Sequence, residues 1–167
     1  MVRIEKHALF IEPARSTGMF ETVVIATDGS ESARRGVRMA LDIADRFDAT
    51  VHALYVVDTD EIETSPEDAR EQLRESIQAA GEDALSFVAS EGNAGDHDVV
   101  TAIEHGDPAT EIIEYAEDVD ADVVAMGTRG RHGDHAFLLG SVAEAVVRRA
   151  PMPVLTVRQL DEDETAC

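Results

Sequence analysis

The stretch "MFETVVIATDGSESARRGVRMALDIA", residues 19–44, contains a strand, a turn and most of a helix in direct succession. Its first part, Thr22 to Thr27, is a short β-branched run of the kind that forms a buried strand. From Ser30 to Phe47, apolar residues recur at steps of three and four, which is the spacing of an amphipathic helix. A strand followed at once by such a helix predicts the first unit of an alternating α/β fold.

The rest of the chain repeats this alternation. Further strands are predicted at 50–57, 98–103, 122–126 and within 150–158. Residues 58–70, "DTDEIETSPEDAR", are predicted as a polar loop leading into a long helix that ends near residue 90. Three capping signals predict where helices start. These signals are Ser65-Pro66 with Asp68, Asp107-Pro108 with Glu111, and Ser141 with Glu144.

Regular alternation predicts one doubly wound α/β domain, with a parallel sheet and helices on both faces. A chain of 167 residues fits one such domain, which we place at 19–158. Residues 1–18 show little periodicity, so we expect a disordered or non-native extension, with an arm packed on the domain as the alternative. Residues 159–167 form an acidic tail.

The charge of the chain is strongly negative. There are 35 acidic against 14 basic residues, a formal net charge of -21, and Lys6 is the single lysine. Such a field repels nucleic acid and anionic membranes, so we expect neither as a partner. An acid-rich, lysine-poor surface suits molar salt, where the Debye length is about 3 Å, and predicts a halophilic, archaeal source; an ordinary acidic protein is the alternative.

Two further features predict a cytoplasmic protein. The chain has no apolar run of about 18 residues, the length that a membrane-spanning helix needs. Its one cysteine, Cys167, supports neither an intramolecular disulfide nor a cysteine-based metal site.

Residues 127–141, "GTRGRHGDHAFLLGS", predict an anion site at the end of the fourth strand. Gly127 and Gly130 allow the backbone to come close to a ligand. Gly140-Ser141 opens a helix, whose unpaired amides and positive dipole end attract anions. Arg129 and Arg131 add positive charge, so the loop suits a triphosphate, and a plain glycine-rich connection is the alternative. A Walker A loop is excluded, because no Gly-Lys-Ser/Thr sequence occurs.

The spacing Gly127-x2-Gly130-x9-Gly140-Ser141 resembles the nucleotide-binding signature of the universal stress protein family. Residues 19–44, "ALYVVD" at 53–58 and "PMPVLTVR" at 151–158 also resemble the family's opening unit, second strand and closing strand. The resemblance covers about residues 19–158. It implies a five-stranded parallel sheet of order 3-2-1-4-5 and a homodimer joined through the last strands. In the family's ATP-binding branch it also implies an ATP pocket, with Mg²⁺ held through the phosphates.

The resemblance also implies roles for individual residues. Asp28 matches the acid that contacts the nucleoside, and Val56 matches the residue whose backbone reads adenine. The other matching positions are Ala26 and Thr27 beside that acid, Met126, Gly127, Arg129 and Gly130 along the phosphate and ribose wall, and Gly140, Ser141 and Val142 at the phosphate-binding helix start. Ala26 is a small departure from the proline that the family often has there.

Simpler interpretations stay open for single residues. The alternative for Asp28 is a cap of the first helix or a contact that holds its turn, and the alternative for Ser141 is a helix cap alone. We expect no metal site made by protein side chains alone at His132, Asp134 and His135, because their spacing falls on a glycine loop and lacks a third strong ligand. Asp58 and Asp60 are candidates to assist a magnesium ion that phosphates hold.

Three functions remain. The first is a nucleotide-responsive homodimer in stress response, with an unknown client protein and with ADP or AMP as alternatives to ATP. The second is a slow ATPase or phosphotransferase, for which the chain shows no clear general base, so no catalytic residue is assigned. The third is a nucleotide-free interaction module, against which the intact glycine signature counts.

Overall fold

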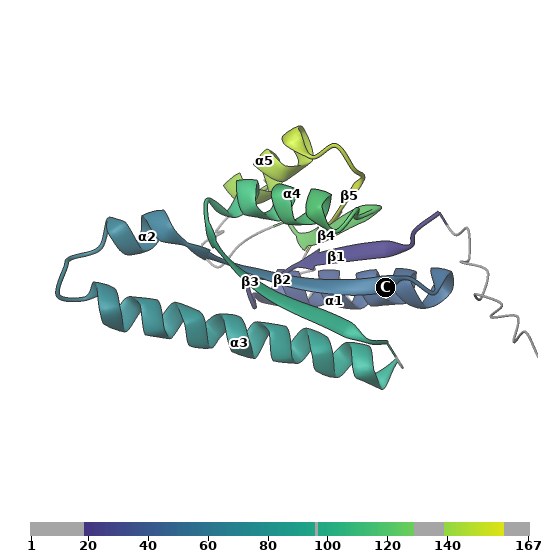
Figure 1. The fold of residues 1–167 in the computed structure, drawn as a ribbon, viewed down its shortest axis with the longest axis horizontal. Helices are drawn as coiled ribbons and strands as arrows, with labels where there is room; N and C mark the ends of the chain where they lie inside the picture. Colours follow the sequence, from purple (N-terminus) through teal and green to yellow (C-terminus); the bar gives the residue numbers. More distant parts are fainter. Residues whose placement is uncertain (1–18, 96, 129–138, 159–167) are drawn as a thin grey trace, which may run out of the picture.

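The computed structural model describes residues 19–95, 97–128 and 139–158. Strands and helices alternate along the chain, as predicted (Figure 1). The strands are β1 (Thr22–Ala26), β2 (Thr50–Asp58), β3 (Val99–Gly106), β4 (Val123–Gly127) and β5 (Val154–Val157). The helices are α1 (Glu31–Phe47), α2 (Thr59–Glu63), α3 (Arg70–Ala94), α4 (Pro108–Asp118) and α5 (Ser141–Arg149).

The five strands form one parallel sheet in the order β3-β2-β1-β4-β5. The predicted fold class and strand order are therefore confirmed. β1 lies at the centre, with Val24 opposite His52 of β2 on one side and Val124 of β4 on the other. The chain winds outward from β1 in both directions, so the strand order reverses between β1 and β4. Clefts for ligands form at such reversals, beyond the carboxyl ends of the strands.

Helices cover both faces of the sheet (Figure 1). Helices α1 and α3 pack on one face, where Val37, Leu41, Leu85 and Val88 join alternate strand residues in a buried core. Helices α4 and α5 pack on the other face, over a smaller core that includes Ile112. Within the described residues, no helix is both long enough and apolar enough to cross a membrane.

The region between β2 and α3 differs from the prediction. The expected polar loop contains α2, because one carboxylate oxygen of Asp58 accepts hydrogen bonds from the amides of Asp60 and Glu61 and caps a helical turn. The predicted cap at Ser65 is wrong. Its hydroxyl donates to the Glu61 carbonyl 2.8 Å away and so completes the end of α2, and α3 begins only at Arg70.

The start of α5 also differs from the prediction. The N-cap is Gly140, and Ser141 is the first helical residue rather than the cap. Among the described residues, no side-chain cap bond is made at this end, and the Glu144 carboxylate instead pairs with Arg148 one turn further on. The predicted capping box is therefore wrong, and the first turn of α5 keeps donors available for another partner.

Candidate functional site

A pocket of about 360 Å³ lies at the carboxyl end of β1, where the strand order reverses. Its volume falls in the range of small-molecule sites. Residues from both halves of the sheet and from four helices form its wall. They are Ala26, Thr27, Asp28, Ala33, Leu54, Val56, Asp58, Glu61, Pro108, Ile112, Met126, Gly127, Gly140, Ser141, Val142 and Ala143.

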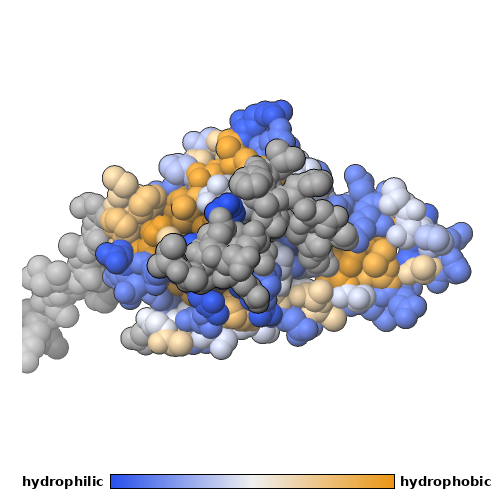
Figure 2. All heavy atoms as spheres, turned by 180° about the vertical axis from the view of Figure 1, so that it is seen from behind, coloured by the Kyte–Doolittle hydropathy of each residue, from blue (hydrophilic) through white to orange (hydrophobic). Residues whose placement is uncertain are grey.

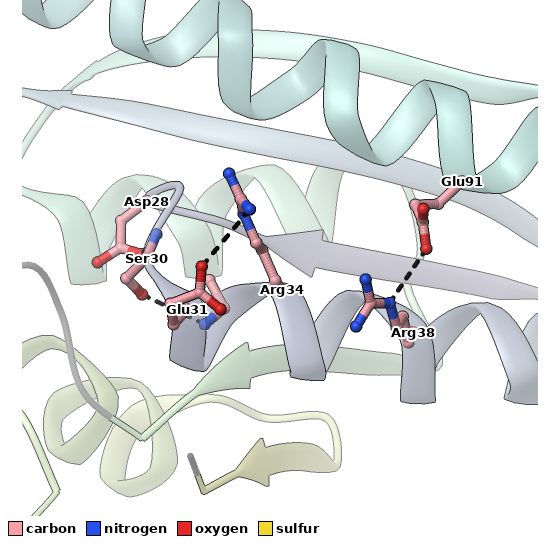
Figure 3. A network of polar contacts seen from close by, with 7 residues as sticks. Asp28, Ser30, Glu31, Arg34, Arg38 and Glu91 are labelled. Carbon is pink, nitrogen blue, oxygen red and sulfur yellow. Dashed lines mark hydrogen bonds and ion pairs between the residues drawn. The ribbon is translucent and has the colours of Figure 1, made fainter. Parts of the chain in front are cut away.

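The turn from β1 into α1 holds Asp28 at the pocket. Gly29 adopts a positive φ of 78°, which lets the chain reverse sharply. Asp28 Oδ1 accepts the Ser30 amide at 2.9 Å, and both residues are shown in Figure 3. Thr27 Oγ1 accepts the Gly29 amide at 3.2 Å. Ser30, not Asp28, caps α1, because its hydroxyl accepts the Ala33 amide. Asp28 thus holds the turn and also lines the pocket.

The opposite wall comes from β4 and α5. Gly127 lies so close to α1 that a Cβ there would come within 2.7 Å of Ser32 Oγ and 2.9 Å of the Ala33 nitrogen. The Gly140 amide donates to the Thr128 carbonyl at 2.8 Å, which ties the start of α5 to the end of β4. Exposed Ser141 and half-buried Val142 then bring the uncapped first turn of α5 to the pocket. A helix start of this kind attracts an anionic group.

The third wall is apolar, with acids at its edge. Leu54 and Val56 of β2 and Ile112 of α4 give it an apolar surface that suits a planar ring. Asp58 and Glu61 follow at the end of β2 and in α2. With Asp28 they give three carboxylates, whereas no lysine or arginine occurs among the described lining residues.

The structure brings together most of the residues that the sequence singled out. Nine of them line the pocket, namely Ala26, Thr27, Asp28, Val56, Met126, Gly127, Gly140, Ser141 and Val142. Arg129 and Gly130 lie outside the described residues, as do His132, Asp134 and His135. Asp58 also lines the pocket, and Asp60 is not among the lining residues. Nucleotide contact by these residues stays a prediction.

Sequence reasoning missed several lining residues, including Glu61, Pro108 and Ile112. The Asp58-x-x-Glu61 spacing is itself a capping signal, and it indicates the short helix that brings Glu61 to the pocket. Pro108 was identified as a helix start, and every helix that follows a parallel strand starts at the carboxyl edge of the sheet. Leu54 and Ile112 carry no such local signal, because packing alone places them there.

This sheet, with a pocket at its strand reversal and a helix start beside it, defines a doubly wound α/β protein with a candidate ligand site. The universal stress protein family model matches residues 19–158, and the chain belongs to this family. Universal stress protein MJ0531 of Methanocaldococcus jannaschii is 39% identical over 142 residues, which make up 84% of this chain and 84% of that protein.

Solved structures agree with this assignment. The structure of protein MJ0577 superposes with a TM-score of 0.72 at 28% identity, covering 86% of this chain and 99% of that one. A universal stress protein crystallised in complex with cAMP superposes with a TM-score of 0.66 at 27% identity, covering 85% of this chain and 99% of the other.

Proposed function

We propose that the pocket binds an adenine nucleotide, with ATP as the ligand and ADP and AMP as alternatives. One observation carries the proposal: the carboxylate of Asp28 and the uncapped start of α5 line the same cavity, together with an apolar wall. A carboxylate accepts hydrogen bonds from ribose hydroxyls, and a free helix start donates to phosphate. That a related universal stress protein was crystallised with cAMP supports an adenine nucleotide in particular.

Each wall then has a part in binding. The backbone of Val56 is assigned to the adenine edge, with Ala26, Leu54 and Ile112 around the ring. Met126 and Gly127 border the ribose and phosphates, and we extend this wall to Arg129 and Gly130. The amides of Gly140, Ser141 and Val142 receive the phosphates.

The acids at the pocket edge favour a nucleotide that carries a cation. Asp28, Asp58 and Glu61 repel a bare triphosphate, and the net charge of -21 adds to that repulsion. Mg²⁺ bound through the phosphates lowers this cost, and molar salt screens what remains. We therefore assign magnesium nucleotide as the ligand form and a salt-rich cytoplasm as the setting.

The same proposal includes a homodimer through β5. Among the described residues β5 pairs only with β4, so its outer edge offers unpaired backbone groups. Val154, Leu155 and Thr156 are only half-buried in the single chain, and Val147 nearby in the sequence is 46% exposed. The dimer would act as a nucleotide-responsive protein in stress response that presents its surface to a client protein, without efficient catalysis.

Calorimetric titration of ATP, ADP and AMP with Mg²⁺ in molar potassium chloride tests the binding proposal. The informative variant is Ser141→Glu, because a carboxylate in the first turn favours the helix yet repels phosphate. We expect ATP affinity to fall about tenfold or more while stability is kept, and the neutral Ser141→Gln to bind like the wild type. ATP binding that is equal in all three proteins, or absent from the folded wild type, would refute the site.

A further inference from the structure

A buried hydroxyl lies beneath the pocket in the first turn of α1. Ser32 is only 1% exposed, and its Oγ donates a hydrogen bond to the carbonyl of Val157 at 3.4 Å. Val157 is the last residue of β5, the edge strand. Alanine would favour the helix more and would bury no polar group, so local helix formation does not explain the serine.

The Val157 carbonyl accepts a second hydrogen bond, which connects it through Thr128 to a pocket residue. The Thr128 amide donates to Val157 O at 3.1 Å, and the Thr128 carbonyl accepts the Gly140 amide at 2.8 Å. Gly140 is the N-cap of α5 and lines the pocket. The end of the edge strand is therefore two hydrogen bonds away from the start of the proposed phosphate-binding helix.

Ser32 also supports the pocket wall from below. A Cβ on Gly127 would come within 2.7 Å of Ser32 Oγ and within 3.0 Å of the Ser32 carbonyl carbon. Gly127 and Ala33, the residue after Ser32, both line the pocket. Gly127 and Ser32 are therefore packed closely enough for a shift of one to be felt by the other.

We infer that Ser32 is a positioning residue that couples occupancy of the pocket to the edge strand β5, so that nucleotide binding and pairing of two chains through β5 strengthen each other. Both events fix the same junction of Ser32, Thr128 and Val157, so the second event has less to order than the first. The inference rests on the proposed nucleotide site and homodimer, and adds the link between them. Linkage makes the effect reciprocal: ATP that tightens the dimer also binds the dimer more tightly than the monomer, and the same total factor is shared by the two sites of the dimer.

Sedimentation of the full chain in molar potassium chloride, with and without saturating magnesium ATP, measures the link as a ratio of dimer dissociation constants. We expect ATP to lower the wild-type dimer dissociation constant about fivefold or more. In Ser32→Ala, which removes the hydroxyl with little loss of volume, this ratio should fall toward one. The ATP affinity of the monomer and the ATP-free dimer constant should each change less than about threefold. A purely structural role for Ser32 would lower the melting temperature and leave the ratio unchanged.

Two further variants complete the design. Ser32→Cys keeps a weak donor and should give an intermediate ratio, and it serves as the test if the alanine variant does not fold. Arg35→Gln is the matched control, because Arg35 Nη1 holds the next carbonyl, that of Arg158, from the same helix. We expect it to keep the wild-type ratio.

The outcomes separate the two proposals. If the chain binds ATP and dimerises but the wild-type ratio is one, or if Ser32→Ala keeps the full ratio, the coupling through Ser32 is wrong and the proposed function stands. If the folded chain does not bind ATP, or stays monomeric, the proposed function is wrong and the coupling falls with it.

Discussion

At the residue scale, Gly127 is a position where the pocket wall lies close to the backbone of α1. Its neighbours are backbone atoms as well as the Ser32 hydroxyl, at 2.7–3.0 Å from an added Cβ, and backbone cannot rotate away. We expect Gly127→Ala to destabilise the fold by about 1–3 kcal/mol, as overpacked sites do, and to weaken ATP binding. Chemical denaturation in molar salt and calorimetry measure the two effects.

Gly36 provides the matched control for that substitution. An added Cβ there would meet nothing closer than the Met126 carbonyl carbon at 3.4 Å, and Gly36 lies inside a helix. Gly36→Ala should therefore be neutral or stabilise by up to about 1 kcal/mol. Equal losses from both substitutions would contradict the close packing described at Gly127.

His52 makes stability depend on pH. Burial lowers the pKa of His52 below its ordinary value of 6.5, so the unfolded chain takes up a proton before the folded chain does. The free energy of unfolding should therefore fall as pH drops through the unfolded value, and His52→Asn should remove this part of the fall. Denaturation curves at a series of pH values from about 7.5 to about 5 measure it.

Tyr115→Phe separates burial from hydrogen bonding at His52. The Tyr115 hydroxyl lies 3.0 Å from His52 Nδ1, and the substitution removes this contact while the ring stays. Because burial is what lowers the pKa of His52, the pH dependence of the free energy of unfolding should persist in Tyr115→Phe. Its loss would assign the effect to the hydrogen bond instead.

At the element scale, α4 and α5 start in different ways, so alanine substitutions at their starts should have different effects on stability. The Asp107 carboxylate accepts both the hydroxyl and the amide of Thr110, at 2.6 and 3.0 Å. Asp107→Ala should cost about 1 kcal/mol at neutral pH. Ser141 makes no capping bond in α5, so Ser141→Ala should change stability by less than about 0.5 kcal/mol.

The cost at Asp107 should vanish in acid. The Thr110 hydroxyl, and after it the Thr110 amide, lowers the pKa of Asp107, so the ionised carboxylate stabilises the fold above the unfolded pKa. That contribution starts to fall below the unfolded pKa of about 4, and the wild type and Asp107→Ala should converge only where the pH lies below the folded pKa. A difference that persists there would show that charge is not its cause.

Prediction from sequence succeeded where the signal is local. The β-branched run at Thr22–Ala26 and the spacing from Glu31 to Phe47 each determine their own element, and alternation then gives the sheet. It failed at α2, where the capping signal of Asp58 and Glu61 was present in the sequence but the helix is too short to show an apolar spacing. It failed at Ser141, because Gly140 takes the cap position and the choice between adjacent residues depends on tertiary contacts.

The residues of the candidate site also fall into those with a local sequence signal and those without one. Asp28, Gly127 and Gly140 were identifiable because turns and helix starts leave a mark in sequence. The place of Ile112 in the pocket depends on how α4 lies over β2 and β3. Such positions follow from the packing of whole elements, which spacing alone does not encode.

At the scale of the whole molecule, the charge of -21 governs behaviour in salt. On the face opposite to Figure 1, hydrophilic side chains lie beside apolar areas (Figure 2). The ion pairs of the described residues lie mostly at the surface, such as Arg38 with Glu91 on neighbouring helices (Figure 3), and add little stability. These ion pairs do not offset the repulsion among the excess acidic side chains, so dissolved salt has to screen it.

We expect the melting temperature to rise by about 4 °C or more between 0.1 and 2 M potassium chloride, where the Debye length falls from about 10 Å to a few ångströms. Differential scanning calorimetry measures the shift, and an osmolyte without charge serves as the control. A melting temperature that is unchanged or lower at high salt would contradict a halophilic surface.

The most direct test of the nucleotide pocket is amide NMR of the labelled chain during titration with magnesium ATP in molar salt. We predict that the largest shift changes fall on Thr27, Asp28, Val56, Gly127 and residues 140–142, on both sides of the strand reversal. Amides of β3 remote from the pocket, such as Val100, should not move. Changes confined to other surfaces, or none at saturating ATP, would contradict the assignment of this pocket as the nucleotide site.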